Sequence, residues 1–173
     1  MLTPAQSSVT LSEEQHACLA AYRDDDLQLM ALASAAKGRG LNRVEELIRF
    51  ADAAGWRRLG LAHCVALRAE ACRLEALLAE NFEVVRVDCK LCRLPAEALV
   101  PGDRGVSCNP IGQALALQAA GTDLNIAMGL CLGHDLLFAR HSHAPVTTLA
   151  VKDRLLQHNP IQALRGEAAD PTG

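Results

Sequence analysis

Two short stretches of the chain place a metal-binding side chain directly before an Asn-Pro pair. "VSCNPIGQAL" does so with Cys108, and "HNPIQAL" does so with His158. Asn-Pro is a favourable helix start, because asparagine caps the first turn and proline fits within it. A helix N-terminus stabilises a thiolate, which is the form of cysteine that binds metals. The two stretches therefore predict ligands that point at one edge of the fold.

The elements that must position these side chains follow from the alternation of apolar segments. Strands are predicted over 57–64, 82–89, 124–131 and 145–153, and helices follow them over 67–78, 109–121, 133–141 and 159–166. Strands that alternate with helices form a parallel sheet with helices on its faces. We expect an α/β fold: a small three-layer doubly wound sheet, mainly parallel, of about four strands, with an N-terminal helical extension.

The chain is expected to divide into three parts. Residues 1–40 form an arm with helices packed on the domain, residues 41–166 form the α/β metal-binding domain, and residues 167–173 form a disordered tail. Gly38 and Gly40 separate the arm from a helix that begins after Asn42, where Glu45 completes an approximate capping box.

Four cysteines fall where the carboxyl ends of the strands should lie. Cys64, Cys89 and Cys131 end the first three strands, and Cys108 follows the long loop that leaves the second. Ligands of open parallel sheets bind beyond this edge, and neighbouring strands are only ~4.8 Å apart. We therefore predict that the four thiols share one metal or cluster.

Other side chains at the same edge are candidates for supporting roles. His134 and His158 are possible ligands or neighbours of ligands, and Lys90 and Lys152 follow strand ends where they could hold an anion. The candidate catalytic residues are His134, Lys90 and Lys152. Packing or solvated positions are expected for Cys18, Cys72, His141 and His143, and packing or a place next to a ligand is expected for His63. The pairs Cys89-x-x-Cys92 and Cys131-x-x-His134 could each chelate a metal, although such spacings are common by chance.

Composition excludes several functional classes. The net charge is −3, and only five residues are aromatic, so a basic, aromatic-rich surface for nucleic acid is not expected. No apolar run reaches the ~18 residues that cross a bilayer, and the start lacks the pattern of a signal peptide. We expect a cytoplasmic protein whose seven cysteines are thiols or metal ligands.

Four thiolates suit either zinc or an iron–sulfur cluster. Structural zinc is usual in small domains that cannot fold without it, whereas the predicted sheet and core can fold without a metal. We therefore favour a functional centre, a [4Fe-4S] cluster with a redox or Lewis-acid role on a small molecule or anion. One alternative is a zinc- or cluster-binding sensor, carrier or electron-transfer module without catalysis. Another is a metal-free enzyme with Cys131 or Cys108 as nucleophile. The apolar side chains of "LLFAR" permit a homodimer without specifying one.

The motifs "AHCVALRAEA", "SCNPIGQA", "GLCLGHDLLFARHSHAPVTTLAVKDR" and "HNPIQAL" resemble those of domain of unknown function 1847, over roughly residues 40–165. Members are often labelled metal-binding proteins, so the resemblance implies a metal site without implying a reaction. The chain departs from the family pattern at two places. The N-terminal cysteine-rich segment of many members is reduced to Cys18, and Asp88-Cys89 stands where members often have two adjacent cysteines. The family pattern falls on the four edge cysteines and on nine neighbours: Lys90, Asn109, Pro110, His134, Asp135, Lys152, Asp153, His158 and Asn159.

Overall fold

The computed structural model describes residues 9–165, and their elements alternate as predicted. The four strands are β1 (Arg58–His63), β2 (Glu83–Asp88), β3 (Leu124–Leu130) and β4 (Val146–Val151). The helices are α1 (Glu13–Leu19), α2 (Asp24–Ala36), α3 (Arg43–Ala53), α4 (Arg68–Leu78), α5 (Pro110–Ala119), α6 (His134–His141) and α7 (Ile161–Arg165). The tail predicted over 167–173 lies outside the described residues.

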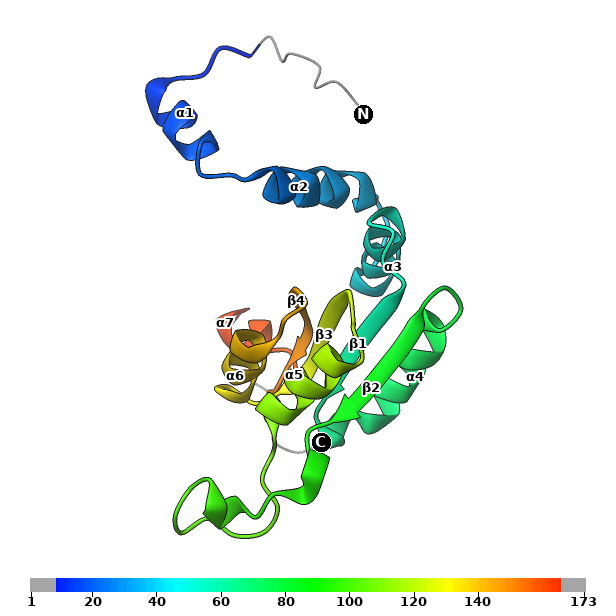
Figure 1. Cartoon of the computed structure of the whole chain (residues 1–173), viewed down its shortest axis with the longest axis vertical. Helices are drawn as coiled ribbons and strands as arrows, with labels where there is room; N and C mark the ends of the chain where they lie inside the picture. Colours follow the sequence, from blue (N-terminus) through cyan, green and yellow to red (C-terminus); the bar gives the residue numbers. More distant parts are fainter. Residues whose placement is uncertain (1–8, 166–173) are drawn as a thin grey trace.

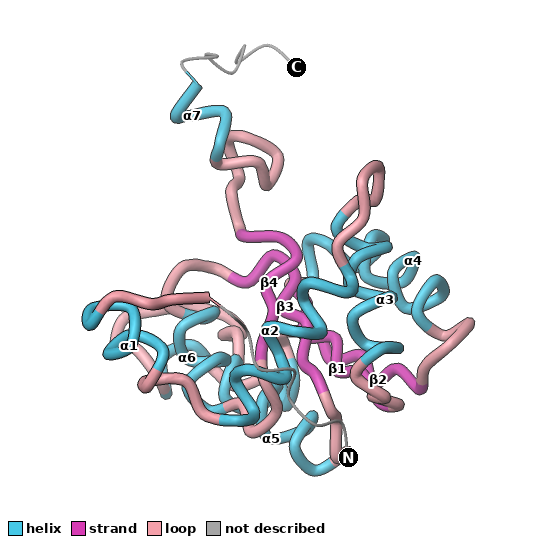
Figure 2. Tube along the Cα trace, turned by 90° about the horizontal axis from the view of Figure 1, so that it is seen from above, coloured by secondary structure: helices cyan, strands magenta, loops and turns pink. Residues whose placement is uncertain are grey.

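The sheet has the order β2-β1-β3-β4, and every pairing is parallel. Helices α3 and α4 lie on one side of the strands and α5 and α6 on the other (Figure 2). The chain runs outward from β1 to β2, then returns to the other side of β1 for β3. This reversal creates a switch point between β1 and β3, where ligands of such sheets bind at the carboxyl ends. The predicted fold class is confirmed.

Two apolar cores flank the sheet, because neighbouring residues on each strand face opposite sides. One core joins β1 and β3 to α3 and α4, and the apolar residues at helical spacing that it buries are Leu67, Ala71, Leu74 and Leu78. The other joins the sheet to α5 and α6 through Leu117 and Phe138. Each fully buried side chain of this size contributes roughly 1.5–3 kcal/mol to folding.

Asparagine side chains start two of the helices, as the sequence predicts. The Asn42 side chain accepts hydrogen bonds from the backbone N–H groups of Val44 and Glu45, and the Asn42 backbone N–H donates to Glu45 Oε2. Asn109 accepts from the backbone of Gly112 at 2.8 Å and so fixes the start of α5. The second Asn-Pro pair behaves differently, because α7 begins only at Ile161 and has five residues.

A bulge near the end of β3 adjusts the edge where the cysteines lie. The pairing of β3 with β4 shifts register at Met128 and again before Leu130. Gly129 has a φ of +67°, and a Cβ at this position would collide with the side chain of Leu67. Only glycine fits both the backbone angle and the close approach of η1 (Val65–Leu67). The bulge sets where Cys131 emerges from the sheet.

The two ends of the sheet carry different extensions (Figure 1). Helices α1 and α2 extend from one end, and the loop over 91–107, drawn in green, extends from the other. Within residues 9–165, no helix combines the length and apolar character needed to cross a bilayer.

Candidate metal centre at the carboxyl edge

Cys64, Cys89, Cys108 and Cys131 line one small cavity, although they come from four separate segments. Cys64, Cys89 and Cys131 each follow the last residue of a strand, one position beyond its end. Gln113, Leu130 and His134 complete the cavity wall. The cavity is too narrow to hold a water molecule. The four cysteines predicted to meet at one edge of the sheet therefore line the same cavity.

Cys89 and Cys108 are a close pair of thiols in this lining. The Cys108 thiol donates to Cys89 Sγ at a distance of 3.6 Å. The Asn109 N–H donates to the Cys89 carbonyl at 2.8 Å, which holds the start of α5 against the end of β2. Burial raises the pKa of the Cys89 thiol to about 12, and the neighbouring Cys108 and Cys64 thiols add to the increase. A nearby cation would reverse this effect by favouring the thiolate.

The other two thiols each contact a positively charged side chain from the segment after β4. Lys152 Nζ donates to Cys64 Sγ at 3.7 Å, and an Arg154 amino group donates to Cys131 Sγ at 3.6 Å. Positive charge beside a thiol stabilises its ionised form. The sequence analysis did not predict Arg154 as part of the site. It lies two residues after Lys152, at the same edge of the sheet.

The structure separates the other predicted candidates. His134 lines the cysteine cavity, whereas His158 lines a second cavity beside it. Lys90 Nζ donates to the Val106 carbonyl at 2.6 Å and so ties the 91–107 loop to the edge. His63 is fully buried, and burial lowers its pKa, so it has the packing position that was expected.

Gln113 is a functional candidate that the sequence analysis missed. Its Nε2 donates to the carbonyls of His63 and Val87, which lie at the ends of β1 and β2. The Oε1 atom is buried and has no hydrogen-bond partner within the described residues. An unpaired buried acceptor is costly and points to a missing donor or cation. The available signal was a polar residue four positions before Leu117, on the buried stripe of α5.

The remaining cysteines and histidines lie apart from this cavity. Cys18, Cys72 and Cys92 are exposed, and none of them lines the cysteine cavity. His141 and His143 are also exposed, in agreement with the solvated positions predicted for them.

No group of three or more His, Cys, Asp or Glu side chains within residues 9–165 is already arranged to hold a metal ion. The cysteines line a common cavity, and the Cys89 and Cys108 sulfurs, 3.6 Å apart, are at the spacing of two ligands on one ion. The [4Fe-4S] cluster and the zinc site therefore stay predictions.

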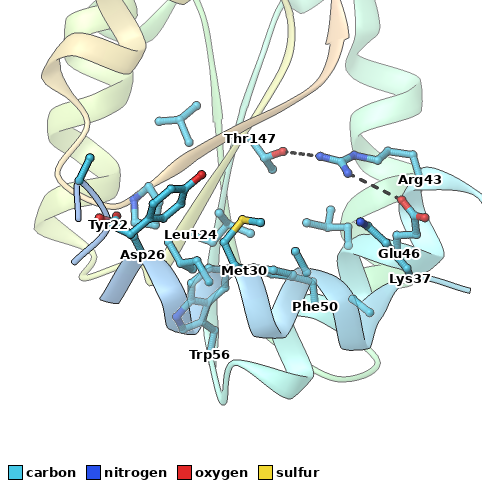
Figure 3. Close-up of a pocket in the computed structure, with 17 residues that line it drawn as sticks. Tyr22, Asp26, Met30, Lys37, Arg43, Glu46, Phe50, Trp56, Leu124 and Thr147 are labelled. Carbon is cyan, nitrogen blue, oxygen red and sulfur yellow. Dashed lines mark hydrogen bonds and ion pairs between the residues drawn. The ribbon is translucent and has the colours of Figure 1, made fainter. Parts of the chain in front are cut away.

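A larger cavity lies at the opposite end of the sheet and has a different character (Figure 3). It encloses about 770 Å³ between α2, α3 and the starts of β3 and β4. Met30, Phe50 and Trp56 supply apolar walls, and Arg43 donates to Thr147 at 2.9 Å beside it. None of its described lining residues is a cysteine or histidine, so it is separate from the candidate metal centre.

Comparisons with known proteins identify relatives of this chain. The family described as "Protein of unknown function (DUF1847)" matches residues 6–149. A curated relative, "Uncharacterized protein MJ0455" of Methanocaldococcus jannaschii, is 44% identical over 127 residues. That alignment covers 70% of this chain and 66% of the relative, so the chain spans slightly less than two thirds of the relative's length. No solved structure matches. The chain belongs to this family of unknown function, which confirms the resemblance.

Proposed function

We propose that this member of the family is a metal-binding protein whose four edge cysteines hold one metal ion as thiolates. The observation that carries the proposal is the shared cavity lined by Cys64, Cys89, Cys108 and Cys131. Soft thiolate donors select zinc-like ions or iron–sulfur clusters over hard cations such as magnesium. The cavity also lies at the sheet edge where ligands of this fold class bind.

The spacing of the close pair favours a single tetrahedral ion over the cluster that the sequence favours. With zinc–sulfur bonds of about 2.3 Å, two thiolates on one tetrahedral ion are about 3.8 Å apart. The separation of 3.6 Å between Cys89 Sγ and Cys108 Sγ is close to this value. A four-cysteine [4Fe-4S] cluster places its thiolates on different irons and therefore needs a wider cavity. Cys64 and Cys131 would turn toward the pair to complete the site.

Gln113 adds a polar group to the same cavity. Its side chain lines the cavity, and its Oε1 has no hydrogen-bond partner among the described residues. This oxygen is an acceptor, so it would be satisfied by a proton donor or by a cation that enters the cavity.

The chain's own residues would prepare the thiolates for binding. Lys152 contacts Cys64 Sγ and Arg154 contacts Cys131 Sγ, so two of the four sulfurs have a positively charged neighbour. His134 at the cavity wall is placed to accept or donate a proton near the ion. The bound ion would supply Lewis acidity if one of its positions is open to another molecule.

A metal-free thiol enzyme is the second candidate, and one contact favours it. Cys131 lies just before α6 and accepts a hydrogen bond from Arg154, an environment that activates a nucleophilic cysteine. In that case Cys131 alone would react rapidly with iodoacetamide, and serine at the other three positions would leave this reaction unchanged.

Serine variants of single cysteines test the metal site. We expect zinc binding to weaken in each of the variants Cys64→Ser, Cys89→Ser, Cys108→Ser and Cys131→Ser. Loss of a hydrogen bond to a metal ligand lowers affinity roughly 10–100-fold, and loss of the ligand itself should lower it further. Cys72→Ser is the matched control, because Cys72 is an exposed thiol on α4. Competition titrations with a zinc-binding dye would measure the affinities. Equal affinities in all five variants would refute a shared site.

A further inference from the structure

A second cavity opens beside the cysteines on the other side of Lys152. It encloses about 670 Å³ at the carboxyl edge of the sheet, a size typical of small-molecule sites. Its floor is apolar, and its wall is polar and comes from the segment after β4. The floor is formed by Ala66, Leu67, Met128 and Ala150, and the wall includes Lys152, Asp153, Arg154, Gln157 and His158.

We infer that this cavity binds a small organic anion whose carboxylate or phosphate group is held by Lys152, Arg154 and His158. The inference rests on the proposed metal site, since it names the class of molecule that would reach the thiols. Two permanent cations, Lys152 and Arg154, line the wall. Basic side chains with several N–H donors are the usual partners of carboxylate and phosphate oxygens.

The acidic residues of the cavity do not cancel this preference. Asp153 uses its Oδ1 atom to accept from the backbone N–H groups of Leu155 and Leu156, so it shapes the loop that carries the cations. Glu70 lies on α4, across the cavity from that loop. Its carboxylate repels an anion, so the anionic group of a ligand should face Lys152 and Arg154 and not α4.

The His158 ring is part of the same wall and is held through Nδ1. The Asp153 backbone N–H donates to this atom at 3.1 Å, and the Val151 carbonyl also lies 3.1 Å from it. Nε2 takes part in neither contact, and it is a donor in the tautomer whose Nδ1 accepts from Asp153. The ring is carried by an unusual backbone, since Gln157 and His158 have φ angles of 50° and 68°, which non-glycine residues adopt at a cost and mostly at functional sites. The second Asn-Pro pair thus follows an imidazole that lines this cavity.

The cations connect the two cavities. Lys152 lines the second cavity and also contacts Cys64 Sγ, and Arg154 lines it and contacts Cys131 Sγ. An anion held by both side chains would lie within one side-chain length of the thiols. The apolar floor would take the carbon part of the same molecule, which favours an organic anion over a bare inorganic one.

Calorimetric titration of the full-length protein, with its metal content measured in the same preparation, tests this inference. The probes are inorganic phosphate and butyrate, which separate the anionic group from the apolar part. We expect both to bind, and we expect Lys152→Gln and Arg154→Gln each to weaken binding about tenfold or more. Lys90→Gln is the matched control, because Lys90 lies on the same edge but donates to the Val106 carbonyl instead.

The outcomes separate this inference from the proposed function. Absence of binding by the wild-type protein, or equal weakening by Lys90→Gln and Lys152→Gln, would overturn the anion site while leaving metal binding intact. Anion binding by a protein that takes up no metal would support the cavity and refute the metal centre. Circular dichroism would confirm folding, and the exposed Arg154 provides a second variant if Lys152→Gln fails to fold.

Discussion

Gln113 is the residue whose chemistry most directly reports what the cysteine cavity holds. Two backbone carbonyls fix the orientation of its amide, because only Nε2 can donate to them. None of residues 9–165 satisfies the oxygen, and a buried acceptor left unpaired costs about 1–3 kcal/mol. A bound cation would remove this cost.

Substitution of Gln113 should therefore change the metal site. We expect Gln113→Leu to weaken cobalt(II) binding by roughly 10-fold and to shift its visible spectrum, because an oxygen near the ion is lost. Asn125→Leu is the matched control, since Asn125 is an equally buried amide near the other end of the sheet. It should lower stability without altering the spectrum. Identical spectra for Gln113→Leu and the wild type would assign Gln113 to strand packing alone.

Among the elements, β3 has the feature on which the cavity geometry depends most. Its bulge at Gly129 sets the position of Cys131 relative to Cys64, whose N–H donates to the Met128 carbonyl at 3.0 Å. The positive φ of Gly129 and the contact with Leu67 both exclude a side chain there.

Gly129→Ala should consequently affect both folding and metal binding. We expect a loss of about 1–3 kcal/mol in the free energy of unfolding, because the added methyl group is strained and collides with Leu67. We also expect weaker zinc binding, because Cys131 would shift. Gly60→Ala is the matched control: it would collide with Asn125 and Leu117, and it should lower stability alone. Chemical denaturation and zinc competition would measure both effects, and unchanged zinc affinity in Gly129→Ala would contradict this role.

The sequence predicted these elements well, because alternating apolar segments and asparagine caps are local signals. Cys64, Cys89 and Cys131 could be placed at one edge because parallel strands end together. The bulge at Gly129, the buried amide of Gln113 and the loop that carries Arg154 could not be predicted. Each depends on contacts between segments distant in the sequence, such as Gln113 with Val87.

At the scale of the whole molecule, the two ends of the sheet have separate characters. One end gathers thiols and positive side chains around a tight cavity and an adjacent open one. The other end holds a large, mainly apolar cavity under α2. The switch point between β1 and β3 explains why the chemistry lies at the first end, since loops there diverge and leave room for ligands. A homodimer stays a prediction from the apolar "LLFAR" segment, in which Leu136 is exposed.

The most direct test of the central claim is the metal content of anaerobically purified protein, measured together with its visible spectrum. Our account predicts one zinc-like ion per chain and a colourless protein, with the metal lost in Cys89→Ser. A brown protein with iron and sulfide would replace the single ion with the cluster. A folded protein that contains no metal and takes up none would contradict the account.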